Sequence, residues 1–390
     1  MNECLLEFFF QQGSSLFHFG IPFQFVGLSK GFTMIKRILK IIGGIFVLFL
    51  LLFGGLLAFS TITDYSPEPG SVEAVETAGE GSTLSGDTFS VLIWNIGYAG
   101  LGAEMDFFND GGKMVRPDED QTAKYLKAIA LFAKNMRDSV DFMLLQEVDR
   151  NSKRSYNIDQ VAVIQQELPG FNSTFALNYD VKFVPVPFGV PYTPYGKTYG
   201  GLASFSRFKP SSSVRVQYPG GFDWPTKLYM LDRCALEQHF PIPGGKELIV
   251  VNTHNTAYDA TGEIKKEEMA FMKKRYEAEV AKGNYVVMGG DWNQVPPGFD
   301  SKHFNKQMPE GYTPQSLSME QIAKDFTVSF DSSLATNRSN DKVFDPASTY
   351  TTLIDYYMTS PNIEVLSVRG IDMQFRWSDH QPVVLKFKLK

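Results

Sequence analysis

The sequence predicts an α/β domain in which two β-sheets pack face to face with helices outside, preceded by one membrane-spanning helix. Three observations support this prediction. An uncharged apolar run lies near the N-terminus, short apolar runs of strand length recur from residue 88 onward, and a few long helical patterns separate them. The many strand-to-strand successions after residue 198 argue against the alternative, one doubly wound sheet. No internal repeat or linker is visible within residues 88–390, so we expect one domain there.

Composition and charge narrow the range of partners. The 390 residues are 43% hydrophobic and carry a formal net charge of −6. Residues 1–59 hold four basic and two acidic side chains, so residues 60–390 hold 33 basic and 41 acidic ones, a net charge of −8. An acidic surface is a poor match for long nucleic acid, but it admits a small phosphoester or a nucleic acid bound through metal ions. Cys4 and Cys234 lie on opposite sides of the apolar run, so no disulfide is expected within residues 60–390.

The apolar run, Ile41–Phe59, reads IIGGIFVLFLLLFGGLLAF and holds no charge. At about 1.5 Å per residue, a helix of this length spans roughly 28 Å, close to the thickness of a bilayer core. The flanking charges are Lys36, Arg37 and Lys40 before the run, and Asp64, Glu68 and Glu73 after it. Because positive charge stays on the cytoplasmic side, the rest of the protein should lie outside the cytoplasm. A signal peptide cleaved near Ala58-Phe59-Ser60 is the alternative, but the run is longer than the usual apolar core of such peptides, so we favour an uncleaved anchor.

These features define four segments. Residues 1–33 show no clear period, and since Met34 opens the normal anchor start MIKRILKIIGG, we interpret them as an upstream mis-start that N-terminal sequencing would test. Residues 34–60 are the signal-anchor segment. Residues 61–87 are rich in Gly, Pro, Ser, Thr and acids, and are expected to form a flexible linker. Residues 88–390 are the folded domain.

Strand and helix patterns alternate within this domain. Phe89–Asn95 is an apolar run of strand length, and a helix is expected from Pro117 to about Met136, where apolar residues recur at helical spacing. The further expected elements are a strand at Asp141–Leu145, a short helix at Val161–Leu168, strands at Leu202–Phe205, Val214–Gln217, Leu228–Glu237 and Glu247–Asn252, an amphipathic helix at Glu263–Ala281, and strands at Tyr285–Met288, Leu353–Met358, Ile363–Arg369 and Pro382–Lys388.

Several of these strands end in, or run into, side chains that bind metals and phosphates. The stretches are VLIWN with Asn95, FMLLQEVD with Glu147, LIVVNTH with His254, VVMGGDWN with Asp291 and Asn293, LIDYYM with Asp355, and WSDHQPV with Asp379 and His380. Each residue alone is more simply explained as a helix cap, a turn former or a hydrogen-bonded structural residue. Since the strands of one sheet commonly deliver their ends to one rim, the whole set predicts a site where these groups converge.

The residue types at this rim indicate the chemistry. Carboxylates and amide oxygens without thiolates favour a hard divalent ion, such as Mg²⁺ or Mn²⁺, over zinc. A hard ion beside neutral imidazole suits hydrolysis of a phosphoester, in which the metal neutralises phosphate charge, an acid orients or deprotonates water, and imidazole stabilises the transition state. Asp355 and His380 add a further indication, because a carboxylate on one imidazole nitrogen fixes the tautomer and raises its basicity.

Taken together, these residues resemble the endonuclease/exonuclease/phosphatase superfamily of DNase-like metal-dependent phosphoesterases, over about Ser90–Lys388. The blocks that carry the resemblance are LQEVD at 145–149, GDWNQ at 290–294, SDHQPV at 378–383, WNIG at 94–97, NTH at 252–254 and IDYYM at 354–358. All six stand in the family's order and at its approximate spacing. The resemblance implies a four-layer α/β/β/α sandwich with a divalent metal ion, Mg²⁺ or Mn²⁺, at the strand rim.

The resemblance also implies a role for each matched residue. The metal-site residues are Asn95, Glu147 and Asp379, with the glutamate as the main ligand. Asp291 resembles the acid that positions or activates the attacking water, and Asn293 its partner at the phosphate. His380 resembles the histidine at the scissile phosphate, oriented by Asp355, acting as base or charge stabiliser. His254 resembles a second histidine that contacts the phosphate or the leaving group.

Some features depart from the family's pattern. The abasic-site endonucleases typically lack a histidine in the NTH block, so His254 argues against that branch. In the block GGLASFSR, Leu202 stands near a position that usually holds Asn, which puts one phosphate contact in doubt. Lys197, in the Pro- and Tyr-rich stretch Val184–Tyr199, and Arg207 are candidate substrate contacts. The alternatives are a rigid packed loop for the first and a surface charge for the second.

Three functions are compatible with the sequence. The first is a metal-dependent phosphodiesterase or nuclease that acts outside the cytoplasm and is tied to the membrane by its N-terminal helix. The second is a phospholipid or sphingomyelin-type phosphodiesterase, or an inositol-phosphate phosphatase; no long apolar hairpin for lipid insertion is visible, which disfavours the lipid enzymes. The third is a non-catalytic binding module, which retention of the site residues disfavours. No protein partner is predicted. The sequence leaves open the substrate, the metal count and the oligomeric state.

Overall fold

A computed structural model of the chain describes residues 27–304, 308 and 313–390. The chain divides into two units, the first ending at Ala58 and the second, here called the main unit, running from Phe59 to Lys390. Most of the predicted N-terminal extension, residues 1–26, lies outside the described residues. Helix α1 (Gly27–Ile62) contains the predicted anchor, and its part Met34–Ile62 is long and apolar enough to cross a membrane by length and composition.

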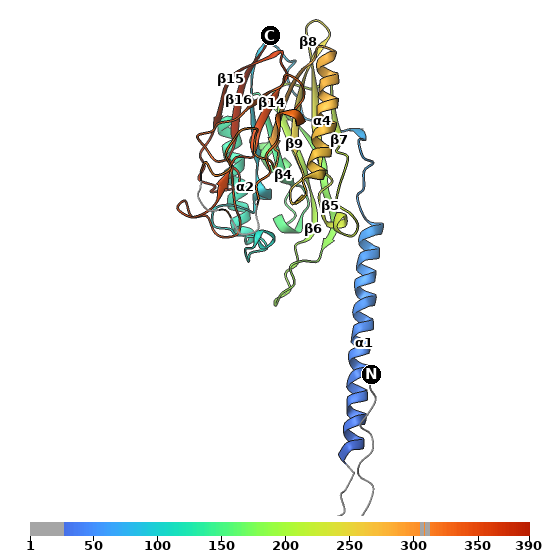
Figure 1. Cartoon of the computed structure of the whole chain (residues 1–390). Helices are drawn as coiled ribbons and strands as arrows, with labels where there is room; N and C mark the ends of the chain where they lie inside the picture. The colour runs from blue at the N-terminus through green and yellow to red at the C-terminus, as the bar shows by residue number, and fades with distance from the viewer. Residues whose placement is uncertain (1–26, 305–307, 309–312) are drawn as a thin grey trace, which may run out of the picture. The chain divides into compact units, whose positions relative to one another are not determined.

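The main unit contains two seven-stranded sheets and a two-stranded ribbon (Figure 1). The first sheet consists, in spatial order, of β1 (Val72–Ala74), β7 (Ser212–Gln217), β8 (Cys234–Ile242), β9 (Lys246–His254), β10 (Tyr285–Asp291), β14 (Asp355–Thr359) and β11 (Thr327–Ser329). The second consists of β15 (Ile363–Gly370), β16 (Val383–Leu389), β3 (Thr88–Asn95), β4 (Phe142–Asp149), β6 (Gly196–Ser206), β5 (Asn172–Val184) and β2 (Thr77–Ala78). The ribbon pairs β12 (Asn337–Arg338) with β13 (Thr351–Thr352).

Three α-helices cover the outer faces of the sheets. They are α2 (Glu119–Met136), α3 (Gln160–Gln166) and α4 (Glu263–Ala281), and five short 3-10 helices lie in the described loops: η1 (Gly97–Ala99), η2 (Phe108–Asp110), η3 (Lys153–Ser155), η4 (Thr226–Tyr229) and η5 (Met319–Gln321). Asp118 caps α2 by accepting a hydrogen bond from Gln121 N, which satisfies a free N–H of the first turn. Figure 1 shows α2 and α4 on opposite outer faces of the main unit.

Hydrophobic side chains fill each space between these layers. Residues of α2 and α3 pack on the outer face of the second sheet, and residues of α4 pack on the outer face of the first. A third cluster lies between the sheets, where Phe89 and Phe142 of the second sheet meet Phe240 and Val287 of the first. Strands buried on both faces read as continuous apolar runs, which explains patterns such as VLIW and LIVV. The predicted four-layer α/β/β/α sandwich is therefore confirmed.

The pairing register brings the predicted site residues to one end of the sandwich. Strand β10 runs parallel to β9 and antiparallel to β14, so Asp291 lies opposite His254 on one side and Asp355 on the other. In the facing sheet, β3 and β4 run parallel and pair Asn95 with Gln146, the residue before Glu147. The site thus forms where the ends of strands from two sheets meet.

The segment 61–87, predicted to be a flexible linker, is paired to both sheets. Its strand β1 adds to β7 of the first sheet, and β2 adds to β5 of the second. A further backbone bridge joins Ser82 to Phe208. The Gly- and Pro-rich composition favours a flexible linker, and it does not reveal that the edge strands of both sheets offer backbone groups for pairing.

Candidate active site

Glu147 lies in a bulge of β4. The pairing of β4 with β6 shifts register between Leu145 and Val148, and Glu147 adopts a left-handed backbone conformation with a φ of 53°. Such a conformation costs on the order of 1–3 kcal/mol for a non-glycine residue and is concentrated at functional sites. The bulge aims the carboxylate at the rim, where 23% of the side chain is exposed, against 2% for Asp291.

Asn95 connects the carboxylates of the two sheets. Its Nδ2 donates to Glu147 Oε1 at 3.1 Å and to Asp291 Oδ2 at 3.0 Å. Its Oδ1 accepts a hydrogen bond from Gly97 N at 3.0 Å. In this arrangement Asn95 orients the two acids through its amide nitrogen. Its role as a metal-site residue stays a prediction.

Asp379 lies in the same region, in the loop that precedes β16 of the second sheet. Its Oδ2 accepts a hydrogen bond from Asn340 Nδ2 at 2.7 Å, and its Oδ1 lies 3.3 Å from Ser378 Oγ. Gly97 makes room for this carboxylate: it has a φ of +49°, and a Cβ at this position would lie 2.9 Å from Asp379 Oδ1. A side chain at residue 97 would therefore push the acid out of place.

His380 and Asp355 form a buried pair. His380 Nδ1 lies 2.8 Å from Asp355 Oδ2, which fixes the ring, and His380 Nε2 lies 3.6 Å from Asp291 Oδ2 and 3.0 Å from Asn337 Nδ2. Burial alone would lower the pKa of His380, but the charges of Asp355, Asp291 and Asp379 outweigh it and raise the pKa well above its usual value. Since three carboxylates surround one imidazole, we assign the proton to His380.

His254 has the opposite electrostatic environment. Its Nε2 lies 3.5 Å from Asp291 Oδ2 and 3.9 Å from Glu147 Oε1. Burial lowers its pKa well below the usual value, and the positive charges of Arg233 and His380 lower it further. The pKa values of the two rim histidines are therefore displaced in opposite directions, which favours a neutral His254 and a protonated His380. Such divergent pKa values are typical of catalytic sites.

The sequence GGDWN turns sharply at the end of β10. Gly290 has a φ of +150°, and a Cβ there would lie 2.0 Å from Thr253 O, so only glycine allows the close approach to β9. Asn293 N donates to Asp291 Oδ1 at 2.9 Å, and Asn293 Nδ2 donates to Asn255 O at 2.9 Å. The turn thus holds Asp291 and Asn293 side by side, with the acid nearly buried and the amide at the rim.

The carboxylates fit a hard divalent cation. Burial and the negative charge of Asp379 raise the pKa of Glu147, so two acids share one region that a cation would neutralise. A second group, Asp291, Asp355 and His380, also offers ligand atoms within 4.8 Å of one another. There the histidine proton already neutralises a carboxylate, so we favour Glu147 and Asp379 as the metal residues.

The two predicted substrate contacts differ in position. Lys197 lies at the start of β6, beyond the point where Asp149 pairs with Gly200, and so at the same end of the sandwich as Glu147. Arg207 lies at the opposite end of the strand. Its guanidinium donates to the backbone oxygens of Arg137 and Val140 in the loop before β4, which favours a structural role over the predicted substrate contact.

Several polar residues near the site have no signal in the sequence. Asn337 and Asn340 come from the loop and ribbon after β11, where no apolar pattern precedes them. Arg154 forms a buried bidentate pair with Asp149, with N···O distances of 2.9 and 2.8 Å. Arg233 is buried near His254, and its Nη1 has no hydrogen-bond partner among the described residues. Their position near the site can be recognised only from the folded structure.

The sequence and the structure both match known proteins. The family model described as "Endonuclease/Exonuclease/phosphatase family" matches residues 92–380. No curated protein matches the chain. An endonuclease/exonuclease/phosphatase from Beutenbergia cavernae is 19% identical, with a TM-score of 0.48, over 78% of this chain and 72% of the other.

Two further solved structures show the same range of similarity. ANGEL2, a 2′,3′-cyclic phosphatase, is 17% identical with a TM-score of 0.49, over 83% of this chain and 99% of the other. Truncated Caenorhabditis elegans TDP2 is 15% identical with a TM-score of 0.48, over 77% and 98% of the two chains. The family model spans well over half of the sequence and includes both ends of the site, from β3 to His380. The chain belongs to the endonuclease/exonuclease/phosphatase family.

Proposed function

We propose that this protein is a divalent-metal-dependent phosphodiesterase, most specifically one that acts outside the cytoplasm from a membrane anchor. Family membership makes the chain a phosphoester hydrolase. The observation that carries the finer proposal is the meeting of His380, Asp291 and Glu147 between two sheets, with 3.6 Å between His380 Nε2 and Asp291 Oδ2 and Asn95 bridging both acids. The carboxylate of Asp291, the imidazolium of His380 and the proposed metal-binding carboxylate of Glu147 thus surround one point.

Each residue has a defined task in this proposal. Glu147 and Asp379 would hold a Mg²⁺ or Mn²⁺ ion, which would supply positive charge at the phosphate. Asp291, whose pKa burial raises, accepts the proton of the attacking water once ionised. The imidazolium of His380 stabilises the negative charge that develops on the phosphate oxygens. Neutral His254 donates a hydrogen bond without adding charge.

The location outside the cytoplasm rests on the charge pattern around α1. The helix has the length and apolarity of a membrane span, with basic residues before its apolar run and acidic residues after it.

A non-catalytic module with the same fold is the alternative. It would not need the bulge at Glu147 or the buried pair of His380 and Asp355, since both cost stability without a ligand.

Hydrolysis of bis-p-nitrophenyl phosphate by the purified full-length protein tests the proposal. We expect turnover with Mg²⁺ or Mn²⁺ and none after chelation. A folded protein that is inactive with every divalent ion would disprove the enzyme and leave the binding module. Plasmid DNA, sphingomyelin and inositol phosphates then identify the substrate class among the remaining possibilities.

A further inference from the structure

The loop between β5 and β6 carries an exposed apolar tip. This loop, Pro185–Tyr195, extends beyond the rest of the main unit (Figure 1). Phe188 is 76% exposed, Tyr192 is 50% exposed and Val190 is fully exposed. The rings of Phe188 and Tyr192 stack with centroids 6.1 Å apart, and Tyr192 Oη donates to Pro185 O at 2.7 Å. The tip is therefore an ordered apolar surface, which soluble proteins rarely present to water without a partner.

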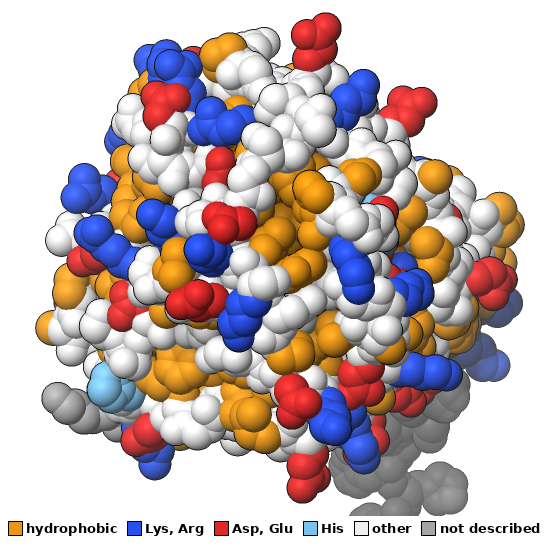
Figure 2. Space-filling model, turned by 90° about the horizontal axis from the view of Figure 1, so that it is seen from above, with side chains coloured by type: hydrophobic (Ala, Val, Ile, Leu, Met, Phe, Trp, Pro, Cys, Tyr) orange, Lys and Arg blue, Asp and Glu red, His pale blue; other side chains and the backbone are white. Residues whose placement is uncertain are grey.

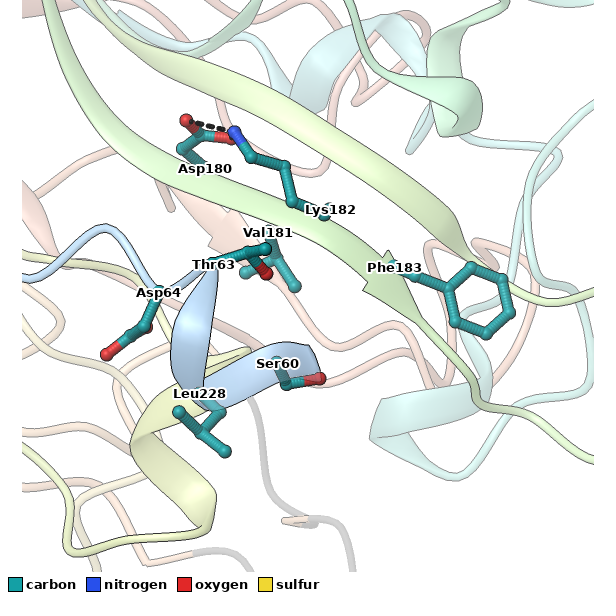
Figure 3. Close-up of a pocket in the computed structure, with 8 residues that line it drawn as sticks. All are labelled: Ser60, Thr63, Asp64, Asp180, Val181, Lys182, Phe183 and Leu228. Carbon is teal, nitrogen blue, oxygen red and sulfur yellow. Dashed lines mark hydrogen bonds and ion pairs between the residues drawn. The ribbon is translucent and has the colours of Figure 1, made fainter. Parts of the chain in front are cut away.

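The base of this hairpin lies beside the end of helix α1. Residues Phe59–Ile62 of the helix belong to the main unit. Ser60 Oγ lies 3.2 Å from Tyr229 Oη, and Trp224 Nε1 donates to Thr61 Oγ1 at 3.1 Å. Figure 3 shows the end of the helix and the following turn facing β5, and the residues that line the small pocket between them are Ser60, Thr63, Asp64, Asp180, Val181, Lys182, Phe183 and Leu228. The C-terminal end of β5, which leads to the apolar tip, thus lies beside the end of the helix.

The hairpin also adjoins the catalytic rim. Strand β6 pairs antiparallel with β4, so the residues before Gly200 lie beyond the C-terminal end of β4, close to Glu147. Arg154, whose charge acts on Glu147, donates from Nη1 to Tyr195 Oη at 2.8 Å at the foot of the hairpin. The tip, the end of the apolar helix and the candidate active site therefore share one end of the main unit.

The opposite end of the main unit has a different surface. Lys390, the C-terminal residue, accepts a hydrogen bond from Tyr285 at the start of β10, far from Asp291 at its end. Figure 2 looks onto this end and shows Lys, Arg, Asp and Glu side chains of both signs spread over it, with hydrophobic side chains between them. Such mixed charge is typical of a surface that stays in water. Among the described large apolar side chains of the main unit, Val190 at the hairpin tip is the most exposed.

We propose that the Pro185–Tyr195 tip inserts into the interface of the bilayer that holds α1, and that the phosphoester is carried on a lipid headgroup. This inference rests on the function proposed above. A membrane is the favoured occupant because the chain's own apolar helix ends beside the hairpin, and aromatic side chains such as Tyr192 and the exposed Trp224 are typical of the bilayer interface. The sequence does not show a long apolar hairpin because Pro and Gly separate these residues; the fold brings them to one tip.

Fluorescence quenching tests the membrane contact without any activity assay. The full-length protein carries Cys4→Ser to remove a second reactive thiol, and Cys234 needs no change because it is buried. Val190→Cys is then labelled with an environment-sensitive dye, and the labelled protein is placed in vesicles. Leu366→Cys, on the exposed face of β15, is the matched control. We expect quenching by lipid-borne nitroxide at residue 190 to exceed that at residue 366 by about threefold or more, with protection from aqueous iodide. Equal quenching at both positions would overturn the proposed contact.

Hydrolysis in vesicles tests the substrate class. The variant Phe188→Ser/Val190→Ser/Tyr192→Ser should lose about tenfold or more of its turnover of vesicle-borne phospholipid, since burial of this apolar surface no longer holds the rim at the lipid. Its turnover of soluble bis-p-nitrophenyl phosphate should equal that of the unmodified protein. Suppose that both proteins hydrolyse the soluble ester. If the tip variant then cleaves lipid at the normal rate, or if neither protein cleaves lipid, the lipid inference fails and the proposed function stands. If neither ester is hydrolysed although residue 190 contacts lipid, the proposed function fails and the membrane surface stands.

Discussion

Replacing Asp355 by Asn removes the negative charge that holds the proton on His380. The two side chains are 0% and 6% exposed, and His380 Nδ1 lies 2.8 Å from Asp355 Oδ2. Asparagine keeps the shape of the side chain but presents no charge, and its NH₂ group favours the tautomer with a bare Nδ1. The imidazolium therefore loses its closest partner while the packing around it is retained.

The size of the effect follows from this contact. A hydrogen bond to a charged group is worth about 1.5–3 kcal/mol. Since one pKa unit corresponds to about 1.36 kcal/mol, the pKa of His380 should fall by about one to two units in Asp355→Asn. If the imidazolium is the active form, the alkaline limb of the kcat/KM profile moves to lower pH by the same amount. At a pH above both values, kcat/KM is then about 10- to 100-fold lower.

The assay is hydrolysis of bis-p-nitrophenyl phosphate from pH 5 to pH 10 at saturating Mn²⁺. Asp138→Asn, at an exposed site beyond α2, is the matched control and should leave the profile unchanged. Thermal unfolding shows whether each variant is folded. An alkaline limb that stays in place in Asp355→Asn, or a rise in activity at low pH, would refute the assignment of the proton and indicate that neutral His380 acts as a base.

Three other substitutions probe the surroundings of the site. Gly97→Ala places a Cβ 2.9 Å from Asp379 Oδ1, so Mn²⁺ affinity measured by calorimetry should fall about tenfold or more, and an unchanged affinity would remove Asp379 from the metal site. Glu147→Gln should abolish activity yet raise the melting temperature of the metal-free protein at pH 8. An acid whose pKa is higher in the folded protein than in the unfolded chain lowers the stability of the fold as pH rises above the unfolded value, so a lower melting temperature would contradict this. Arg154→Met leaves a buried carboxylate unpaired and should cost about 3–5 kcal/mol in urea unfolding, whereas Arg150→Met at an exposed ion pair should cost less than about 1 kcal/mol. Equal losses of unfolding free energy in the two variants would show that the buried ion pair stabilises the fold no more than the exposed one.

Much of the fold could be predicted because its strands are buried on both faces. Apolar runs such as those ending at Asn95, Glu147 and Asp291 mark strands whose ends meet at one rim. The short edge strands in residues 61–87 could not be predicted in this way. They are only three and two residues long and mostly exposed, and their pairing depends on the backbone groups of β7 and β5 rather than on side-chain pattern.

The site shows the same division. Residues on strand ends were predictable, since the register of β10 alone brings His254 and Asp355 to Asp291. Asn337 could not be predicted in this way, because it contacts His380 from a ribbon whose strands show no hydrophobic pattern in the sequence. Arg207 was judged from its motif as a candidate contact, but a motif does not tell at which end of a strand a side chain lies.

The role of His380 is tested by comparing the unmodified protein with His380→Ala in two measurements on the same preparation. We expect Mn²⁺ affinity to be unchanged, since the proposed metal site is at Glu147 and Asp379. Turnover of bis-p-nitrophenyl phosphate should fall by about 10²–10³-fold, since a transition-state contact is lost. A variant that binds Mn²⁺ normally and hydrolyses the ester at a near-normal rate would show that His380 does not stabilise the reacting phosphate.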